Sequence, residues 1–246
     1  RGLGDVYKRQ EYIKEHGYSR HLYEFKDEYA NMPVDVQKDE EKGLYYVQKE
    51  KKRLYFRKST PAKKIQKYYR ALSMEQDRRS PHHYFNSVKE VTGKVFVDVG
   101  CAEGYSSLEI IEEAKHVYLF EQDEQWLEAI RATFEPWQDK VTIVQKYVSD
   151  HNSSREQTLD DFFNNQTNEH LFLKMDIEGA ERHALAGCNN LFQNCQKLDF
   201  AICTYHLRDD EEVISAFLDK HNCTYINQKG FFRHKIRSVV MRGSKK

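Results

Sequence analysis

The strongest constraint on the fold is the stretch VFVDVGCAEGYSSLEII, which runs from Val95 to Ile111. It opens with β-branched and aromatic residues, which is typical of a short strand buried on both faces. A turn with two glycines follows, and an apolar-periodic segment then begins at two serines, as at the start of a helix. The stretch predicts a strand, a tight turn and a helix, with Asp98, Gly100 and Gly104 at the strand's carboxyl end. In open α/β sheets this edge holds ligands.

The spacing of the glycines indicates the kind of ligand. A dinucleotide-binding turn needs glycines at 100, 102 and 105, but Ala102 and Tyr105 stand at two of these positions, so pyrophosphate binding loses support. The pattern D-x-G-x-x-x-G instead resembles the first motif of S-adenosylmethionine-dependent methyltransferases, where the glycine backbone lies close to the amino-acid part of the cofactor. An ordinary turn after a buried strand remains an alternative. The candidate cofactor-binding residues of this turn are Asp98, Gly100, Glu103 and Gly104.

Another candidate carboxylate lies about twenty residues after the glycine turn, at the end of the next strand. Val117 to Phe120 form that strand, and Glu121 follows it directly. A ribose-binding acid occupies this position in nucleoside-binding α/β units, and one carboxylate can accept hydrogen bonds from both ribose hydroxyls. The alternative is that Glu121 caps the helix from Asp123 to Phe134. The distance in sequence between the glycine turn and Glu121 favours ribose binding.

The rest of the carboxyl-terminal part alternates between apolar strands and amphipathic helices, which implies crossover units in a parallel sheet. Further strands are predicted at Val141 to Gln145, Leu171 to Leu173 and Leu198 to Thr204. Two closing strands, Cys223 to Ile226 and Ile236 to Met241, flank Lys229-Gly230 and predict a hairpin-like antiparallel pair. We expect an α/β fold with a doubly wound, mostly parallel sheet, a terminal antiparallel strand and a small N-terminal α+β module. The resemblance to S-adenosylmethionine-dependent methyltransferases implies that the sheet is their seven-stranded class I methyltransferase sheet.

The chain is expected to divide into three segments. Residues 1–10 read as translated adapter sequence left by library preparation and are set aside from fold reasoning. Residues 11–92 are expected to form a helical and hairpin module. Residues 93–246 are expected to form the cofactor-binding methyltransferase domain.

The N-terminal module contains clear hairpin and helix signals. Leu44 to Val47 and Leu54 to Phe56 are apolar-aromatic runs, and the polar stretch Gln48 to Arg53 joins them as a hairpin turn. A helix is then predicted to begin with Thr60 as its N-cap and Pro61 as its first helical residue.

Two further stretches of the module could contact a ligand. The loop from Glu75 to Tyr84 is dense in polar, ionisable and aromatic residues, and we expect it to line a pocket rather than to bind a metal, because adjacent His82 and His83 lack zinc-ligand spacing. The stretch Lys49 to Arg70 holds ten Lys or Arg residues against one acid. A solvated surface is favoured over nucleic-acid binding, because the chain as a whole is balanced in charge.

Composition excludes several classes of protein. The formal net charge is +0, so the chain has no general attraction for nucleic acid or anionic membranes, and no apolar run approaches the length of a membrane span. Five cysteines, an odd number without C-x-x-C spacing, indicate reduced thiols rather than disulfides or a zinc site. A cytoplasmic location is expected.

A second cluster of acids lies in the stretch LFLKMDIEGAERHALAG, from Leu171 to Gly187. Glu178 and Glu181 fall in a first helical turn, where the helix dipole favours acids in any protein. Asp176 stands at the strand end, where the dipole gives no such reason for an acid. Asp150, just past the third strand, could accept from an adenine amino group, with an ordinary turn cap as an equal alternative.

Taken together, these segments resemble the FkbM family of S-adenosylmethionine-dependent methyltransferases. The resemblance is carried by VDVGCAEGYSSL (97–108), LFEQD (119–123) and especially LKMDIEGAE (173–181), which is similar to the family's K-x-D-x-E-G-x-E signature. The stretch from Tyr69 to Tyr84 is similar to a segment of one bacterial branch of the family. The resemblance implies S-adenosylmethionine as the cofactor, with Glu178 among its binding residues, and methyl transfer, usually to oxygen.

The expected catalytic residues are His206 and Asp176. Methyl transfer from a sulfonium is an in-line displacement, so alignment supplies much of the barrier reduction, and a hydroxyl acceptor must also lose its proton. We expect His206 to act as the base, with Asp176 orienting it or the acceptor. The family's fifth strand would end in Glu-x-His, but this chain has Cys203-Thr-Tyr-His206, so only the histidine carries over. A lone D-x-E at Asp176 and Glu178 is too common to predict a magnesium site.

Other functions stay open at this stage. The acceptor is expected to be a small molecule or a glycan. An RNA methyltransferase that uses the basic stretch 49–70, a non-catalytic S-adenosylmethionine-binding protein and an NAD-linked oxidoreductase are the alternatives. The sequence does not predict the oligomeric state.

Overall fold

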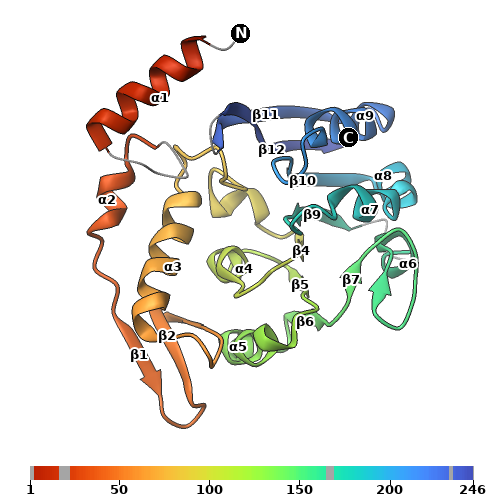
Figure 1. Ribbon diagram of the computed structural model, residues 1–246. Coiled ribbons are helices and arrows are strands. Elements are labelled where there is room, and N and C mark those ends of the chain that lie inside the picture. The colour runs from red at the N-terminus through yellow and green to blue at the C-terminus, as the bar shows by residue number, and fades with distance from the viewer. Residues whose placement is uncertain (1–2, 17–22, 165–168, 233–234, 246) are drawn as a thin grey trace.

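The computed structural model describes residues 3–16, 23–164, 169–232 and 235–245, and a seven-stranded sheet forms its centre (Figure 1). The strands are β4 (Val95–Val99), β5 (His116–Phe120), β6 (Val141–Val144), β9 (His170–Met175), β10 (Lys197–Cys203), β11 (Thr224–Phe232) and β12 (Lys235–Lys245). Their order in the sheet is β11-β12-β10-β9-β4-β5-β6. Neighbours from β10 to β6 are parallel, whereas β12 pairs antiparallel with both β10 and β11. The predicted mostly parallel sheet with an antiparallel strand is confirmed.

Helices cover both faces of this sheet, which explains the continuous apolar run in β4. They are α4 (Tyr105–Ile110), α5 (Glu124–Phe134), α6 (Leu159–Phe162), α7 (Glu181–Ala186), α8 (Asn189–Asn194) and α9 (Asp210–Lys220). Val95, Val97 and Val99 join the hydrophobic cluster under α6 to α9, and Phe96 joins the cluster under α4 and α5. Short 3-10 turns, η1 (Val88–Val91) and η2 (Glu135–Trp137), and a two-residue strand pair, β7 (Tyr147–Val148) with β8 (Glu156–Gln157), complete this part.

The N-terminal module packs against the α4 and α5 side of the sheet. It consists of α1 (Leu3–His16), α2 (Lys26–Ala30), β1 (Val36–Asp39), β2 (Leu44–Lys49), β3 (Lys52–Tyr55) and α3 (Ala62–Glu75). Its buried apolar residues from Val34 onward belong to the same hydrophobic cluster as those of α4 and α5, whereas Tyr23 and Phe25 lie outside that cluster. The backbone N–H of Tyr55 in β3 donates to the Thr133 hydroxyl of α5 at 3.0 Å. The module and the sheet therefore share one core.

The hairpin in the module is confirmed, but its details differ from the prediction. Gln48 and Arg53 pair within the ladder, and the turn consists only of Glu50 and Lys51. Glu50 has φ +56, which permits this tight connection. The strand β1 was not predicted because its residues are polar and half exposed, without an apolar alternation.

Two predicted boundaries are wrong. Pro61 rather than Thr60 is the N-cap of α3, in an extended conformation, and no side chain caps the helix. Lys229-Gly230 lies inside β11 instead of in a turn. The connection between β11 and β12, at residues 233–234, lies outside the described residues. Backbone pairing extends both strands past their apolar residues, because ladder hydrogen bonds do not depend on side-chain polarity.

Within the described ranges, no helix combines the length and the apolar character that a membrane crossing requires. The chain's five cysteines are all free thiols.

Candidate active site

A pocket of about 750 Å³ opens at the carboxyl ends of β4, β5 and β9. It is lined by residues of the glycine turn, by Glu121 after β5 and by Asp176 after β9. Residues of α3 and of the loop after it form the opposite wall. The site lies where open α/β sheets bind their ligands.

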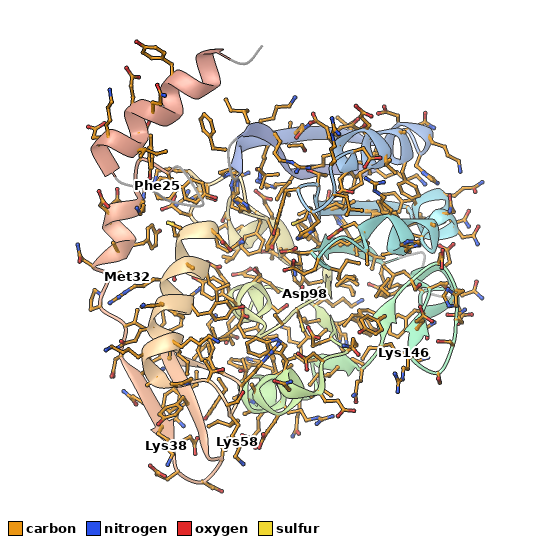
Figure 2. The ribbon with its side chains drawn as sticks, viewed as in Figure 1. Phe25, Met32, Lys38, Lys58, Asp98 and Lys146 are labelled. Carbon is orange, nitrogen blue, oxygen red and sulfur yellow. The ribbon has the colours of Figure 1, made fainter. Side chains whose placement is uncertain are left out.

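Asp98 is connected to the glycine turn through Lys174. It is 1 % exposed and lies near the centre of the molecule (Figure 2). Its carboxylate pairs with Lys174 at 2.8 Å and accepts from the Ser107 hydroxyl at 2.6 Å. Lys174 also donates to the Gly100 carbonyl at 2.7 Å. Burial disfavours the lysine charge, but Asp98 and Asp176 hold the pKa of Lys174 above its ordinary value.

The two glycines of the turn are required by packing within the protein. Gly100 has φ +79, and a Cβ there would lie 2.1 Å from the Asp176 carbonyl oxygen. Gly104 has φ +80, and its Cβ would lie 2.7 Å from the Phe134 ring. Gly100 lines the pocket, whereas Gly104 is not among the lining residues. The spacing of the two glycines is thus explained by close contacts of the turn with Asp176, which follows β9, and with Phe134 of α5.

Glu121 faces the pocket with both carboxylate oxygens held by backbone N–H groups. Oε2 accepts from Ala102 at 3.0 Å, and Oε1 accepts from Asp123 at 2.8 Å. The helix cap is supplied by Asp123, whose side chain accepts from the Gln125 N–H at 3.0 Å. Each Glu121 oxygen retains a second lone pair. Ala102 has φ +48, a costly conformation for alanine, and it aims its N–H at Glu121.

Glu103 is a buried acid in the pocket wall. It is 3 % exposed and accepts a hydrogen bond of 2.8 Å from the Tyr68 hydroxyl of α3. Burial raises the pKa of Glu103 to about 7, although the Tyr68 hydrogen bond opposes this shift. The site therefore contains a carboxyl group that changes charge near neutral pH.

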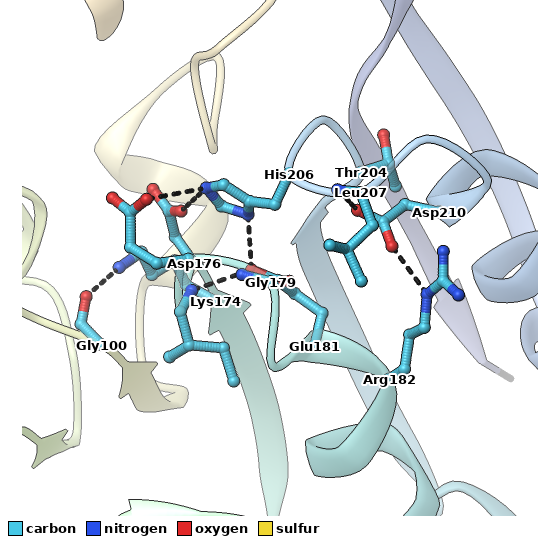
Figure 3. A network of polar contacts seen from close by, with 12 residues as sticks. Gly100, Lys174, Asp176, Gly179, Glu181, Arg182, Thr204, His206, Leu207 and Asp210 are labelled. Atoms are coloured by element: carbon cyan, nitrogen blue, oxygen red, sulfur yellow. Dashed lines mark hydrogen bonds and ion pairs between the residues drawn. The ribbon is translucent and has the colours of Figure 1, made fainter.

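Asp176 lies at the end of β9 with one oxygen bonded and the other facing His206. Oδ2 accepts from the Tyr84 hydroxyl at 2.6 Å, and Oδ1 lies 3.5 Å from His206 Nε2 (Figure 3). Burial would raise the pKa of Asp176, but Lys174, His206 and the Tyr84 hydrogen bond hold it below its ordinary value.

His206 is fixed by Glu181. The His206 side chain is 9 % exposed, and its Nδ1 lies 2.8 Å from Glu181 Oε1. Glu181 is fully buried and also accepts from the N–H groups of Ile177 and Gly179 at 2.9 and 3.0 Å. Burial alone would lower the pKa of His206, but the Glu181 hydrogen bond and the nearby carboxylates raise it. In the sequence Glu181 looks like an ordinary acid of a first helical turn, so its contact with His206 was not predicted.

The structure does not bring every candidate residue into the pocket. The Asp150 carboxylate pairs with His151 at 2.7 Å and His183 at 3.3 Å, and Asp150 is absent from the pocket lining of the described chain. Glu178 borders the pocket, but its side chain is 92 % exposed. His206 stands behind Asp176 rather than in the lining.

The predicted segment from Glu75 to Tyr84 lines the pocket through Glu75 at the end of α3 and through Gln76, His82 and Tyr84 of the loop that follows.

Part of the basic stretch 49–70 forms ion pairs within the protein. Arg57 pairs with Asp123 at 2.8 Å and lies 4.0 Å from the Trp126 ring centre, and Lys49 pairs with Glu109 at 3.6 Å.

Solved methyltransferase structures are similar to this chain. The chain is similar to the crystal structure of methyltransferase FkbM from Methylobacillus flagellatus KT, with 19 % identity and a TM-score of 0.50, over 61 % of this chain and 43 % of that one. It spans less than half of that protein's length. The magnesium protoporphyrin IX methyltransferase from Synechocystis PCC 6803, determined with bound SAM, gives 12 % identity and a TM-score of 0.48 over 76 % of this chain and 86 % of that one.

No curated protein sequence matches the chain. The likeness to the Methylobacillus flagellatus protein, at 19 % identity, shows the fold alone. The family model described as the methyltransferase FkbM domain matches residues 64–226, which include the glycine turn, Glu121, Asp176 and His206. The chain therefore belongs to the FkbM methyltransferase family.

Proposed function

We propose that this protein transfers a methyl group from S-adenosylmethionine to a hydroxyl group of a small molecule or glycan. The observation that carries the proposal is Glu121, which stands at the rim of the pocket above Gly100 with both oxygens oriented by backbone N–H groups. A carboxylate held in this way offers its remaining lone pairs to the two hydroxyls of a ribose. Asp150, which lies away from the pocket, is not part of this proposal.

The charges of the pocket suit a cationic cofactor. Glu103 and Glu121 line it, and neither has a cationic side-chain partner among the described residues. Lys174, the buried cation nearby, is paired with Asp98. A sulfonium and an ammonium group would therefore gain favourable electrostatic energy in this pocket.

The acceptor side of the site is assigned to Asp176 and His206. S-adenosylmethionine supplies an activated methyl group when it is bound. The chain's own task is to align the acceptor and to make its hydroxyl proton easier to remove. Asp176 lines the pocket and can bind the hydroxyl, and His206, oriented by Glu181, supports Asp176 from behind.

Binding and turnover test the proposal separately. Titration calorimetry should detect S-adenosylmethionine binding and no comparable NADH binding. Incubation with methyl-deuterated cofactor and a panel of sugars, phenols and polyketides should give S-adenosylhomocysteine and a product heavier by one labelled methyl group. Tight binding of NADH, or a labelled methyl group found only on RNA, would contradict the proposal.

Replacing Glu121 should weaken cofactor binding strongly. Hydrogen bonds to a charged group contribute about 1.5–3 kcal/mol, so Glu121→Gln should raise the Kd for S-adenosylmethionine by about ten to a hundredfold. The matched control is Glu128→Gln, on the exposed face of α5. Equal affinities for both variants in calorimetry would remove Glu121 from the site.

Cofactor affinity should also rise with pH through the ionisation of Glu103. Its pKa is raised to about 7, so the carboxyl is mostly neutral at pH 6 and mostly ionised at pH 8. If the cation binds the ionised form, the Kd should fall by about tenfold over this range. Glu103→Gln keeps an acceptor for Tyr68 and serves as the control for titration of the cofactor itself. The same pH dependence in this variant would show that Glu103 is not responsible.

A further inference from the structure

Two buried polar atoms face each other behind the pocket without a hydrogen-bond partner. They are Asp176 Oδ1 and His206 Nε2, and neither atom forms a hydrogen bond with any described part of the chain. They lie 3.5 Å apart (Figure 3). Glu178 Oε2 lies 3.6 Å from the same nitrogen. A buried polar group without a partner is costly, so an arrangement of this kind calls for an explanation.

The other atoms of these groups are already engaged. Tyr84 donates to Asp176 Oδ2 at 2.6 Å, which leaves Oδ1 available. Glu181 accepts from His206 Nδ1 at 2.8 Å, so the neutral imidazole carries its hydrogen on Nδ1 and its lone pair on Nε2. In this state Nε2 has a carboxylate oxygen of Asp176 and one of Glu178 within 3.6 Å and offers neither of them a hydrogen.

We propose that Asp176, His206 and Glu178 form a binding site for a divalent first-row transition-metal ion such as Zn²⁺. Ligand atoms about 2.1 Å from a tetrahedral ion lie about 3.4 Å apart, close to the separations from Nε2. Asp176 and His206 belong, with Glu181, to a group whose ligand atoms lie within 4.8 Å of one another. In the proposed site Glu181 orients His206 through Nδ1, and Glu178 supplies the third ligand. Three protein ligands leave a fourth position for water or the acceptor, as in catalytic zinc sites.

The surroundings match those of histidine-containing metal sites. A metal-bound histidine usually donates its other ring N–H to a carboxylate, and Glu181 occupies that place. Imidazole as a ligand favours Zn²⁺ and similar first-row ions such as Cu²⁺, Fe²⁺ or Ni²⁺ over Ca²⁺, Mg²⁺ and Mn²⁺. Lys174 is neutralised by Asp98, so the carboxylates leave a net negative charge for a dication.

The catalytic use of this ion rests on the proposed methyl transfer. An ion at this site would lower the pKa of a hydroxyl bound to it, whereas a nearby carboxylate on its own raises that pKa. The hydroxyl proton then leaves to solvent or to a nearby base, and the oxygen forms the new bond to the methyl carbon. The bond from that carbon to the sulfonium sulfur breaks at the same time, which releases S-adenosylhomocysteine. His206 then acts as a ligand instead of as the base expected from the sequence.

Metal binding can be measured without knowing the acceptor. Purified protein, treated with EDTA and dialysed, should bind one Zn²⁺ per chain in calorimetry, and Co²⁺ should give the visible absorption bands of tetrahedral coordination. Glu178→Gln, on an exposed side chain, and His206→Gln should each weaken Zn²⁺ binding by at least about tenfold and reduce the Co²⁺ bands. His151→Ala removes the exposed cluster with Asp150 and His183, and Glu212→Gln removes a surface acid, so both controls should keep the site.

Two outcomes would overturn the proposal. One is a wild-type protein that binds neither ion. The other is Zn²⁺ binding that Glu178→Gln leaves intact but His151→Ala removes. Calorimetry with S-adenosylmethionine on the EDTA-treated protein separates this failure from failure of the proposed function, because the cofactor contacts at Glu121 and Glu103 do not involve these ligands.

Discussion

Asp176→Asn is expected to lower kcat by about a hundredfold or more while the Kd for S-adenosylmethionine stays within about threefold. The substitution keeps an oxygen that can accept from Tyr84, so the loop after α3 should remain in place. It removes the negative charge beside His206 and the oxygen that faces Nε2. The acceptor hydroxyl then loses its activating group, whether Asp176 acts directly or as a metal ligand.

Initial rates of S-adenosylhomocysteine formation, with the acceptor found by the screen, measure this effect. Asp139→Asn, in an exposed turn, makes the same chemical change away from the site and should have wild-type rates. Thermal melting of both variants checks their folding. A kcat within threefold of wild type would remove Asp176 from the catalytic assignment.

Gly100→Ala is expected to cost about 3–5 kcal/mol of folding free energy. The added Cβ would lie 2.1 Å from the Asp176 carbonyl oxygen and 2.6 Å from an Ile177 methyl carbon. The carbonyl cannot move away freely, because the Asp176 N–H donates to the Val99 carbonyl at 3.0 Å. A left-handed φ of +79 adds about 1 kcal/mol for a residue with a side chain.

Gly93→Ala separates these two contributions. Gly93 has φ +70, and a Cβ there meets no atom within 4 Å, so only the backbone term of about 1 kcal/mol should remain. Urea unfolding of both variants gives the two free energies. Equal losses would mean that the close approach to Asp176 is not what requires glycine at position 100.

The sheet could be predicted well from the sequence because strands buried on both faces consist of continuous apolar runs. β4 is buried along its whole length and reads as an apolar run, and α5 shows both its cap at Asp123 and an apolar stripe. The polar strand β1 and the extensions of β11 and β12 left no such signal, because backbone pairing forms them without apolar side chains.

The site was predictable in its positions but not in its contacts. Asp176 and Glu121 follow strands, and parallel strands bring their ends to one edge. Glu178 and Glu181 look equivalent in sequence, yet φ +56 at Glu178 turns its side chain to solvent while Glu181 is buried against His206. The pairs Asp98–Lys174 and Glu181–His206 join residues far apart in the chain, so no local pattern reveals them.

The shared core of the N-terminal module and the sheet restricts how the pocket can open. Since β3 and α3 contribute to the same hydrophobic cluster as α4 and α5, swinging them outward would expose that cluster to water. We therefore expect ligands to enter through movements of side chains at the pocket rather than through movement of β3 or α3. Acceptor preference could then change through substitutions on the pocket side of α3 without any alteration of the strands beneath.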